Sequence, residues 1–283
     1  MKPFDEFRNQ NASFWAFIKM ASESLGYTDR LRGGVKSYSE DELSELCKKK
    51  NVEASDKLLS DSASYVQRRA NLLNDFVESR LMDAQSASEE YKKLEELHRN
   101  GNFHCNLPLN KQKGNKKQIA FFTAIVNILA EKSVRELTGL TQSVGFDDNP
   151  RGLLYVWDEQ RRLIGASSRR FDGAFPSVEN PQIVWEIKEY YYATTFGSRV
   201  ADGIYETLLD GYELKDLFDR SGHKVYHVLF IDAYRTWWQS GKSYLCRLVD
   251  AMNAGFVDEV IVGREALTRW PELLKSIITG VRP

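Results

Sequence analysis

The first part of the chain carries apolar residues at helical spacing among polar ones. This pattern predicts an amphipathic helix ending at Gly26, whose apolar positions are Phe14, Trp15, Phe17, Ile18 and Leu25. Ser37 or Ser39 can cap a short helix over residues 40–50. A longer segment, 61–99, repeats the helical spacing. The pattern therefore predicts a largely helical beginning.

A break within this helical segment is expected at residues 83–88. Residues 108–117 (PLNKQKGNKK) are polar and basic and contain Pro, Gly and Asn, a composition typical of a linker. The domain boundary is predicted there. It separates an all-helical module, residues 1–110, which would serve DNA recognition or dimerisation, from a second domain, residues 111–283.

The second domain alternates between helical and strand patterns. The predicted helices are 118–134, 198–218, 243–254 and one within 265–278, and the predicted strands are 153–157, 163–175, 182–192, 224–233 and 257–262. The segment 224–233 (KVYHVLFIDA) is nearly continuously apolar, as buried strands are. This order predicts an α/β domain in which a central sheet is flanked by helices on both faces.

Composition excludes several classes of protein. The chain has 283 residues, 42% of them apolar, and a net charge of −1, so it is neither a polycation nor an acidic disordered chain. It contains no run of about 18 apolar residues and no secretory signal pattern, so an intracellular protein without a membrane span is expected. Three cysteines lie far apart, which argues against a disulfide framework. His104-Cys105 lacks the second ligand pair that a structural zinc site needs, so no such site is expected.

One set of polar residues spans two consecutive predicted strands. Asp172 lies near the end of the first strand, and Glu186-Ile187-Lys188 lies within the second. Strand side chains alternate, so Glu186 and Lys188 are expected on one face of the sheet. The turn 176–181 would bring Asp172 beside Glu186 if the two strands pair as neighbours.

These residue types suit a divalent cation. Two adjacent carboxylates repel each other, and a cation between them removes that cost. Mg²⁺ prefers oxygen ligands, which Asp172, Glu186 and the backbone carbonyl of Ile187 can supply. Lys188 could deprotonate or orient an attacking water, or stabilise charge on a phosphate. A solvated cross-strand ion pair between Glu186 and Lys188 is the alternative explanation of the same residues.

The arrangement resembles the PD-(D/E)XK nuclease superfamily, whose signature is an acid, a spacer, and then an acid, any residue and lysine on the next strand. Here Asp172 is followed after thirteen residues by Glu186-Ile187-Lys188, and Phe171 replaces the proline that often precedes the first acid. The resemblance covers about residues 118–234. It implies a restriction-endonuclease-like core with a mixed sheet.

The resemblance also implies the chemistry of the site. Asp172 and Glu186 would be Mg²⁺ ligands, Mn²⁺ would substitute for Mg²⁺, and Lys188 would be the catalytic lysine. Members of the superfamily often add an acid from the preceding helix, for which Glu131 is the first choice and Glu136 the second. Helical spacing places Glu136 on the apolar stripe and Glu131 off its edge.

Several basic residues are candidates for contacts with DNA. Two clusters contain no acid, and they include Lys116, Lys117, Arg161, Arg162, Arg169 and Arg170. They would contact phosphates if the nuclease interpretation holds; otherwise they are ordinary surface or linker charges. In the helical module, Gln67, Arg68 and Arg69 are alternative readers of DNA, or part of a solvated face.

The expected function is a Mg²⁺-dependent endonuclease acting on double-stranded DNA, of the type II restriction kind. A homodimer in the cytoplasm of a prokaryotic cell is expected, because one site per chain must cut two strands. The alternatives are a phage-defence or repair nuclease without strict site specificity, a catalytically inactive DNA-binding protein, and an interaction protein without DNA affinity.

Overall fold

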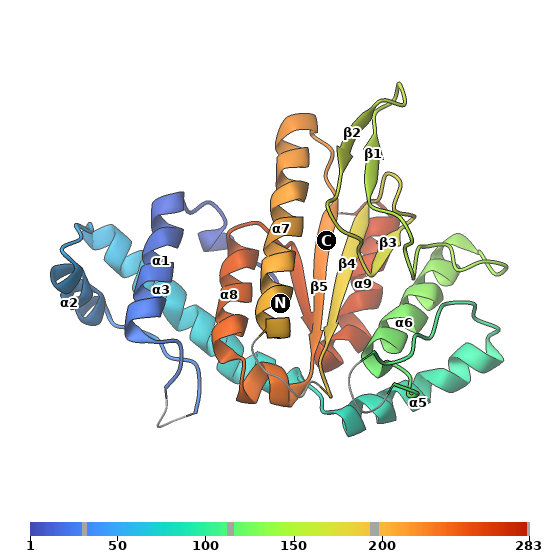
Figure 1. Ribbon diagram of the computed structural model, residues 1–283, viewed down its shortest axis with the longest axis horizontal. Helices are drawn as coiled ribbons and strands as arrows, with labels where there is room; N and C mark the ends of the chain where they lie inside the picture. Colours follow the sequence, from blue (N-terminus) through green and yellow to red (C-terminus); the bar gives the residue numbers. More distant parts are fainter. Residues whose placement is uncertain (30–32, 112–115, 193–197, 282–283) are drawn as a thin grey trace.

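A mixed four-stranded sheet forms the centre of the molecule (Figure 1). The computed structural model describes residues 1–29, 33–111, 116–192 and 198–281. The strand order is β3-β4-β5-β6, in which β3 runs antiparallel to β4 and the other neighbours are parallel. The four strands are β3 (Gly173–Phe175), β4 (Ile183–Glu189), β5 (Tyr226–Asp232) and β6 (Glu259–Val262).

Helices cover both faces of this sheet, as the alternating pattern predicted (Figure 1). Trp185 and Phe230 point into a core shared with α6 (Phe121–Thr138) and α9 (Ala266–Ile278). On the opposite face, Leu229 and Ile231 pack with residues of α7 (Ser198–Ser221) and α8 (Lys242–Asn253). The predicted α/β class with a mixed sheet is therefore confirmed.

The amino-terminal helices have a core of their own. It involves η1 (Asp5–Phe7), α1 (Ala12–Leu25), α2 (Glu40–Lys50) and α3 (Asp56–Asn71). Ser39 caps α2 in a reciprocal capping box with Glu42, which accounts for the predicted start of that helix. Gly26 ends α1 with a φ of 85°, a conformation that favours glycine.

The helical segment predicted over 61–99, with its expected break, is divided into several elements. The chain forms α3, a π-helical turn η2 (Leu72–Val77), the short α4 (Glu78–Arg80) and then α5 (Ala84–Asn100). Leu81 adopts an extended conformation, and the Asp83 side chain caps α5 by accepting from the Ser86 backbone N–H. The break thus lies a few residues before the predicted one, where the polar cap residue competes with helix continuation.

Helix α5 packs against α6 and contributes Ala87 and Tyr91 to the core around Trp185. The domain boundary predicted after residue 110 would assign α5 to the helical module. That boundary stays a prediction, although the packing of α5 links it to the sheet domain.

The strand predicted over 163–175 is also interrupted. Its first part, β2 (Leu163–Ala166), pairs with β1 (Tyr155–Trp157) in a separate two-stranded hairpin, and its last part is β3. Residues 167–172 cross between the two sheets. Two short helical turns, η3 (Arg235–Gln239) and η4 (Gly263–Glu265), complete the fold. In the part of the chain that the structure describes, no helix has the length and apolarity needed to cross a membrane.

Candidate active site

Strands β3 and β4 bring Asp172 beside Glu186, as the sequence predicted. Gly173 pairs with Trp185 across the two strands, and the Asp172 N–H donates to the Trp185 carbonyl at 3.0 Å. A Cβ at Gly173 would lie 2.1 Å from the Trp185 ring, so only glycine allows the strands to pass so closely. This explains the Asp-Gly pair and fixes Asp172 opposite Glu186.

The Asp172 carboxylate also contacts the backbone of the ExK segment. Its Oδ2 accepts a hydrogen bond of 2.8 Å from the Ile187 N–H. Asp172 faces solvent with part of its surface. The protein packed around its carboxyl and the nearby charge of Glu186 nevertheless raise the pKa of Asp172 to about 6.

Glu186 and Lys188 lie on the face of β4 that is turned toward α7. Both are buried, and Nζ of Lys188 lies 3.0 Å from Oε2 of Glu186. Nζ also lies 2.7 Å from Oε2 of Glu206, on α7. Burial disfavours the ammonium, but Glu186, Tyr190 and Glu206 together outweigh burial, and the pKa of Lys188 is raised. The ion pair between Glu186 and Lys188 is therefore part of a largely buried network that also includes Glu206.

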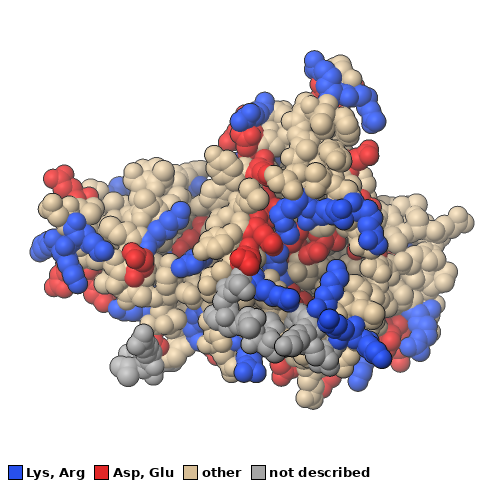
Figure 2. Space-filling view, viewed as in Figure 1, with Lys and Arg blue, Asp and Glu red and all other residues tan. Residues whose placement is uncertain are grey.

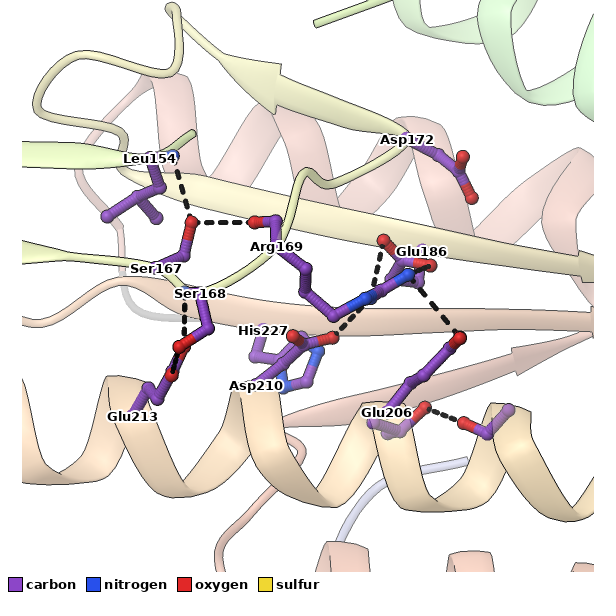
Figure 3. A network of polar contacts seen from close by, with 12 residues as sticks. Leu154, Ser167, Ser168, Arg169, Asp172, Glu186, Glu206, Asp210, Glu213 and His227 are labelled. Carbon is purple, nitrogen blue, oxygen red and sulfur yellow. Dashed lines mark hydrogen bonds and ion pairs between the residues drawn. The ribbon is translucent and has the colours of Figure 1, made fainter. Parts of the chain in front are cut away.

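Arg169 is at the centre of this network (Figure 3). Its Nη1 lies 3.1 Å from Oε1 of Glu186 and 2.8 Å from Oδ2 of Asp210, while its Nη2 lies 3.3 Å from Oε2 of Glu206. The guanidinium thus joins three carboxylates. The predicted role of Arg169 as a phosphate contact is not favoured by this arrangement, because its charge is already used within the protein.

Asp210 is fully buried, and its Oδ1 has no hydrogen-bond partner among the described residues. Burial raises the pKa of Asp210 to about 7, although Arg169 opposes that shift. His227, on β5, is also buried; burial lowers its pKa, and its Nδ1 contacts the Phe256 carbonyl at 2.9 Å. These groups form the buried side of the site.

Sequence reasoning missed the contribution of α7. Glu206, Asp210 and Glu213 are spaced i, i+4 and i+7, so they share one side of the helix. Each holds a different group: Glu206 contacts Lys188, Asp210 contacts Arg169, and Glu213 accepts from the N–H of Ser168 at 2.9 Å and from its hydroxyl. The spacing of these acids was the signal that could have identified them.

The structure does not bring Glu131 to this group. Glu131 is fully buried on α6, where it accepts hydrogen bonds from the backbone N–H groups of His104 at 2.9 Å and Cys105 at 2.6 Å. Arg135 binds the same carboxylate at 2.5 Å. Its predicted catalytic role is not supported, because its oxygens anchor a loop. Glu136, the second choice, is exposed and lies 3.8 Å from Lys132.

Glu189 lies on the other face of β4, because side chains alternate along a strand. It accepts from the backbone N–H of Thr123 at 3.0 Å and from the Thr123 hydroxyl at 3.1 Å, at the start of α6. Burial raises the pKa of Glu189 to about 7. Glu189 therefore supports the fold and takes no part in the group around Glu186.

The other predicted DNA contacts lie at the surface. Lys116, Lys117 and Arg170 are exposed, with no ion-pair partner within the described ranges. Arg161 is exposed beside the Trp157 ring, and Arg162 is paired with Asp158 at 2.6 Å. Figure 2 shows Lys and Arg side chains around acidic ones on the face that carries α7 and the sheet.

The readers proposed in the helical module are engaged elsewhere. Arg69 is fully buried and donates to both oxygens of Asp250 on α8, at 2.9 and 3.0 Å. Arg68 lies 2.5 Å from Glu6. The assignment of Arg69 as a DNA contact is therefore wrong, since its side chain ties α3 to α8.

The residues around Asp172 fit a hard divalent cation in part. Oε1 of Glu186 is buried and has no aligned hydrogen bond within the described part of the chain, although Arg169 is near. The N–H and C=O of one strand residue point to the same side, so the Ile187 carbonyl faces the edge occupied by Asp172. Among the described residues, no group of three or more His, Cys, Asp or Glu side chains is placed so that it could hold a metal ion.

Two family models match the chain. One, described as Domain of unknown function (DUF7690), matches residues 1–76, and the other, described as Domain of unknown function (DUF7687), matches residues 82–277. No curated protein and no solved structure matches the chain. The second model spans more than half of the sequence and includes Asp172, Glu186 and Lys188. The chain therefore belongs to the family described as Domain of unknown function (DUF7687).

Proposed function

We propose that the protein is a Mg²⁺-dependent endonuclease that hydrolyses phosphodiester bonds of double-stranded DNA, of the type II restriction kind. One observation carries the proposal: Asp172, directly before β3, lies opposite Glu186 on β4, with Lys188 on the same face as Glu186. This is the arrangement that the resemblance to the PD-(D/E)XK superfamily implies.

Three oxygen donors would hold the cation: the carboxylates of Asp172 and Glu186 and the carbonyl of Ile187. Mg²⁺ suits such donors and would stabilise negative charge developing on the phosphate. Within the protein, Asp172 is kept in place by the Ile187 N–H, and Glu186 by Arg169 and Lys188. Both carboxylates are thereby oriented before substrate arrives, which lowers the cost of reaching the reactive geometry.

Lys188 has the role of a cationic donor in this proposal. Its ammonium is held by Glu186 and Glu206, so it is directed along the face on which the phosphate would lie. A donor fixed in this way can orient the attacking water or bind a phosphate oxygen. Glu206 and Arg169 act through other side chains and are positioning residues.

The surrounding surface offers groups for the DNA backbone. Arg170 follows the central Arg169 directly and is exposed, and Lys116 and Lys117 are exposed as well. Such side chains would bind phosphates in a salt-dependent manner. Cutting both strands would employ two copies of the chain, one site for each strand, and we place this reaction in the cytoplasm.

The proposal is tested with purified full-length protein, Mg²⁺ and phage DNA. We expect cleavage by the wild type and none by Asp172→Ala, Glu186→Ala or Lys188→Ala, each checked for folding by circular dichroism and thermal unfolding. Equal cleavage by the triple-alanine variant and the wild type would overturn the proposal. Discrete bands would favour site-specific cutting, and a smear would favour a defence or repair nuclease.

A second candidate is a DNA-binding protein of the same fold without turnover. The engagement of Glu186 by both Arg169 and Lys188 favours it, since a carboxylate neutralised by two cations binds a metal less readily. DNA binding in EDTA, with no strand cleavage in Mg²⁺ or Mn²⁺, would identify this case.

A further inference from the structure

The hairpin of β1 and β2 projects beyond the central sheet (Figure 1). Its base is fixed in a small core through Leu154 and Val156. Gly165 packs so closely on α7 that a Cβ there would lie 2.6 Å from Leu217. The base of the hairpin is therefore anchored, while its tip, residues 158–162, lies beyond the core.

The strand β2 exposes apolar side chains on both of its faces. Leu163 is 52% exposed and Ile164 is 39% exposed, although neighbouring strand residues point in opposite directions. Adjacent apolar side chains left on a projecting strand indicate a contact surface.

The charge of this segment matches a polyanion. Residues 151–170 contain five arginines and two acidic residues, within a chain whose net charge is −1. Asp158 is paired with Arg162, and Arg169 is engaged by the carboxylates of the candidate active site. Three arginines and one acid of this segment remain without an ion-pair partner among the described residues: Arg151, Arg161, Arg170 and Glu159. The hairpin and the crossing that follows it thus concentrate positive charge in a nearly neutral protein, which favours DNA over a protein partner.

The tip of the hairpin is braced by its own contacts. Oδ1 of Asp158 accepts from the N–H groups of Gln160 at 2.9 Å and Arg162 at 2.8 Å. Arg161, which has a φ of 62°, places its guanidinium 5.6 Å from the centre of the Trp157 ring. A preformed element loses less conformational entropy on binding than a loose loop.

The hairpin also lies within reach of the candidate active site. Seven residues lead from Arg162 to Arg169, which contacts Glu186, and seven extended residues span at most about 25 Å. That reach is shorter than one turn of a DNA duplex, about 34 Å. A duplex bound at Asp172 would therefore pass within one helical turn of the hairpin.

We propose that the β1–β2 hairpin enters a groove of double-stranded DNA and determines which sequences the protein binds, through Arg161, Leu163 and Ile164. A two-stranded ribbon fits the major groove, where arginine reads guanine and apolar side chains contact the thymine methyl group. The inference rests on the proposed action on DNA and names the part of the protein that selects the sequence.

The experiment compares full-length wild type with the double variant Arg161→Ala/Leu163→Ser in Ca²⁺, without cleavage. A randomised duplex library is selected on the wild type, and binding of the enriched duplex and of a scrambled one is followed by fluorescence anisotropy. We expect the variant to lose about tenfold or more of the preference for the enriched duplex. The matched control, Arg99→Ala/Leu140→Ser, also removes an exposed arginine and an exposed leucine, and it should keep that preference.

A photoreactive benzoylphenylalanine at position 163 identifies the neighbour directly. Cross-linking to DNA is expected. Cross-linking only to a second copy of the chain would overturn the inference, as would an unchanged preference in the hairpin variant. Sequence preference and cross-linking both measure DNA binding and not cleavage. If the protein binds DNA selectively through the hairpin but never cuts it, the proposed nuclease function is wrong and the inference about the hairpin stands.

Discussion

The ammonium of Lys188 on β4 lies 2.7 Å from the carboxylate of Glu206 on α7. This contact joins the sheet to the helix that covers it, at the point where the candidate active site is formed. Glu206 is partly exposed. Burial acts to raise the pKa of Glu206, but the hydrogen bond and charge of Lys188, together with the charge of Arg169, outweigh burial and lower it. At neutral pH the Lys188 ammonium and the Glu206 carboxylate are therefore both charged.

Replacement of this helix carboxylate tests its positioning role. Glu206→Gln should reduce the rate of DNA cleavage about 10- to 100-fold, the range typical of groups that orient an active-site residue. The pH profile should shift as well, because Lys188 loses a charged partner. Asp216→Asn, which removes an exposed acid of the same helix paired with Arg220, is the control and should leave the rate unchanged.

Removal of the central guanidinium should destabilise the protein. Arg169→Met leaves the buried carboxylate of Asp210 without its cation, which should cost about 2–4 kcal/mol in the free energy of unfolding. The double variant Arg169→Met/Asp210→Asn should recover part of that loss, since no buried charge is stranded. Urea unfolding of the wild type, the two single variants and the double variant measures the coupling energy between Arg169 and Asp210. If the losses of the two single variants simply add up in the double variant, the two side chains are not coupled and the prediction is wrong.

Glu131 offers a test of structural against catalytic roles. Glu131→Gln weakens the anchoring of the loop at His104 and Cys105 and the ion pair with Arg135, so it should lower the free energy of unfolding by about 1–3 kcal/mol. At a temperature where the variant is folded, its cleavage rate should equal that of the wild type. A rate loss as complete as that of Glu186→Ala would restore Glu131 to the active site.

The buried ion pair between Arg69 and Asp250 should hold the helical module against α8. Asp250→Asn should cost about 3–5 kcal/mol, because it strands a fully buried guanidinium. Glu6→Gln, which breaks the exposed pair with Arg68, should change stability by less than about 1 kcal/mol. Calorimetry of both variants provides the comparison, and similar small effects would show that the buried pair is dispensable.

The pH dependence of stability should reflect Asp232. Burial raises the pKa of Asp232 from 3.8 to about 8. Between those values the folded protein binds more protons than the unfolded chain, so stability should fall as the pH rises. The wild type should melt at a lower temperature at about pH 9 than at about pH 6.

Asp232→Asn should reduce that difference in melting temperature. The amide can still accept from the N–H groups of Met82 and Ala233 and can donate to the Tyr191 hydroxyl, which contacts this side chain. Asparagine carries no group at this position that gains or loses a proton in this pH range. An undiminished dependence on pH would assign the effect to other buried acids, such as Glu189.

Local pattern was sufficient for part of the structure. The capped helix α2 and the alternation on β4 follow from neighbouring residues in the sequence, so Glu186 and Lys188 were placed on one face correctly. The pairing of Asp172 with this strand followed from a short connecting turn. Each of these features depends on contacts within about 15 residues.

The remainder depended on contacts between distant elements. Helical spacing could not show that Glu131 faces a loop, since the partner N–H groups come from a segment before α6. Arg169 looked like a free surface charge because its partners Asp210 and Glu206 lie on a later helix. The strand predicted over 163–175 is broken where this arginine turns toward α7.

The acidic row of α7 has a consequence for how the site would respond to disturbance. Glu206, Asp210 and Glu213 belong to one continuous helix, and a tilt or slide of that helix would displace all three together. Lys188, Arg169 and Ser168 would then lose their anchors in a single event. We therefore expect the site to switch between two states, one with these contacts formed and one with all of them broken, and not to lose the contacts one by one.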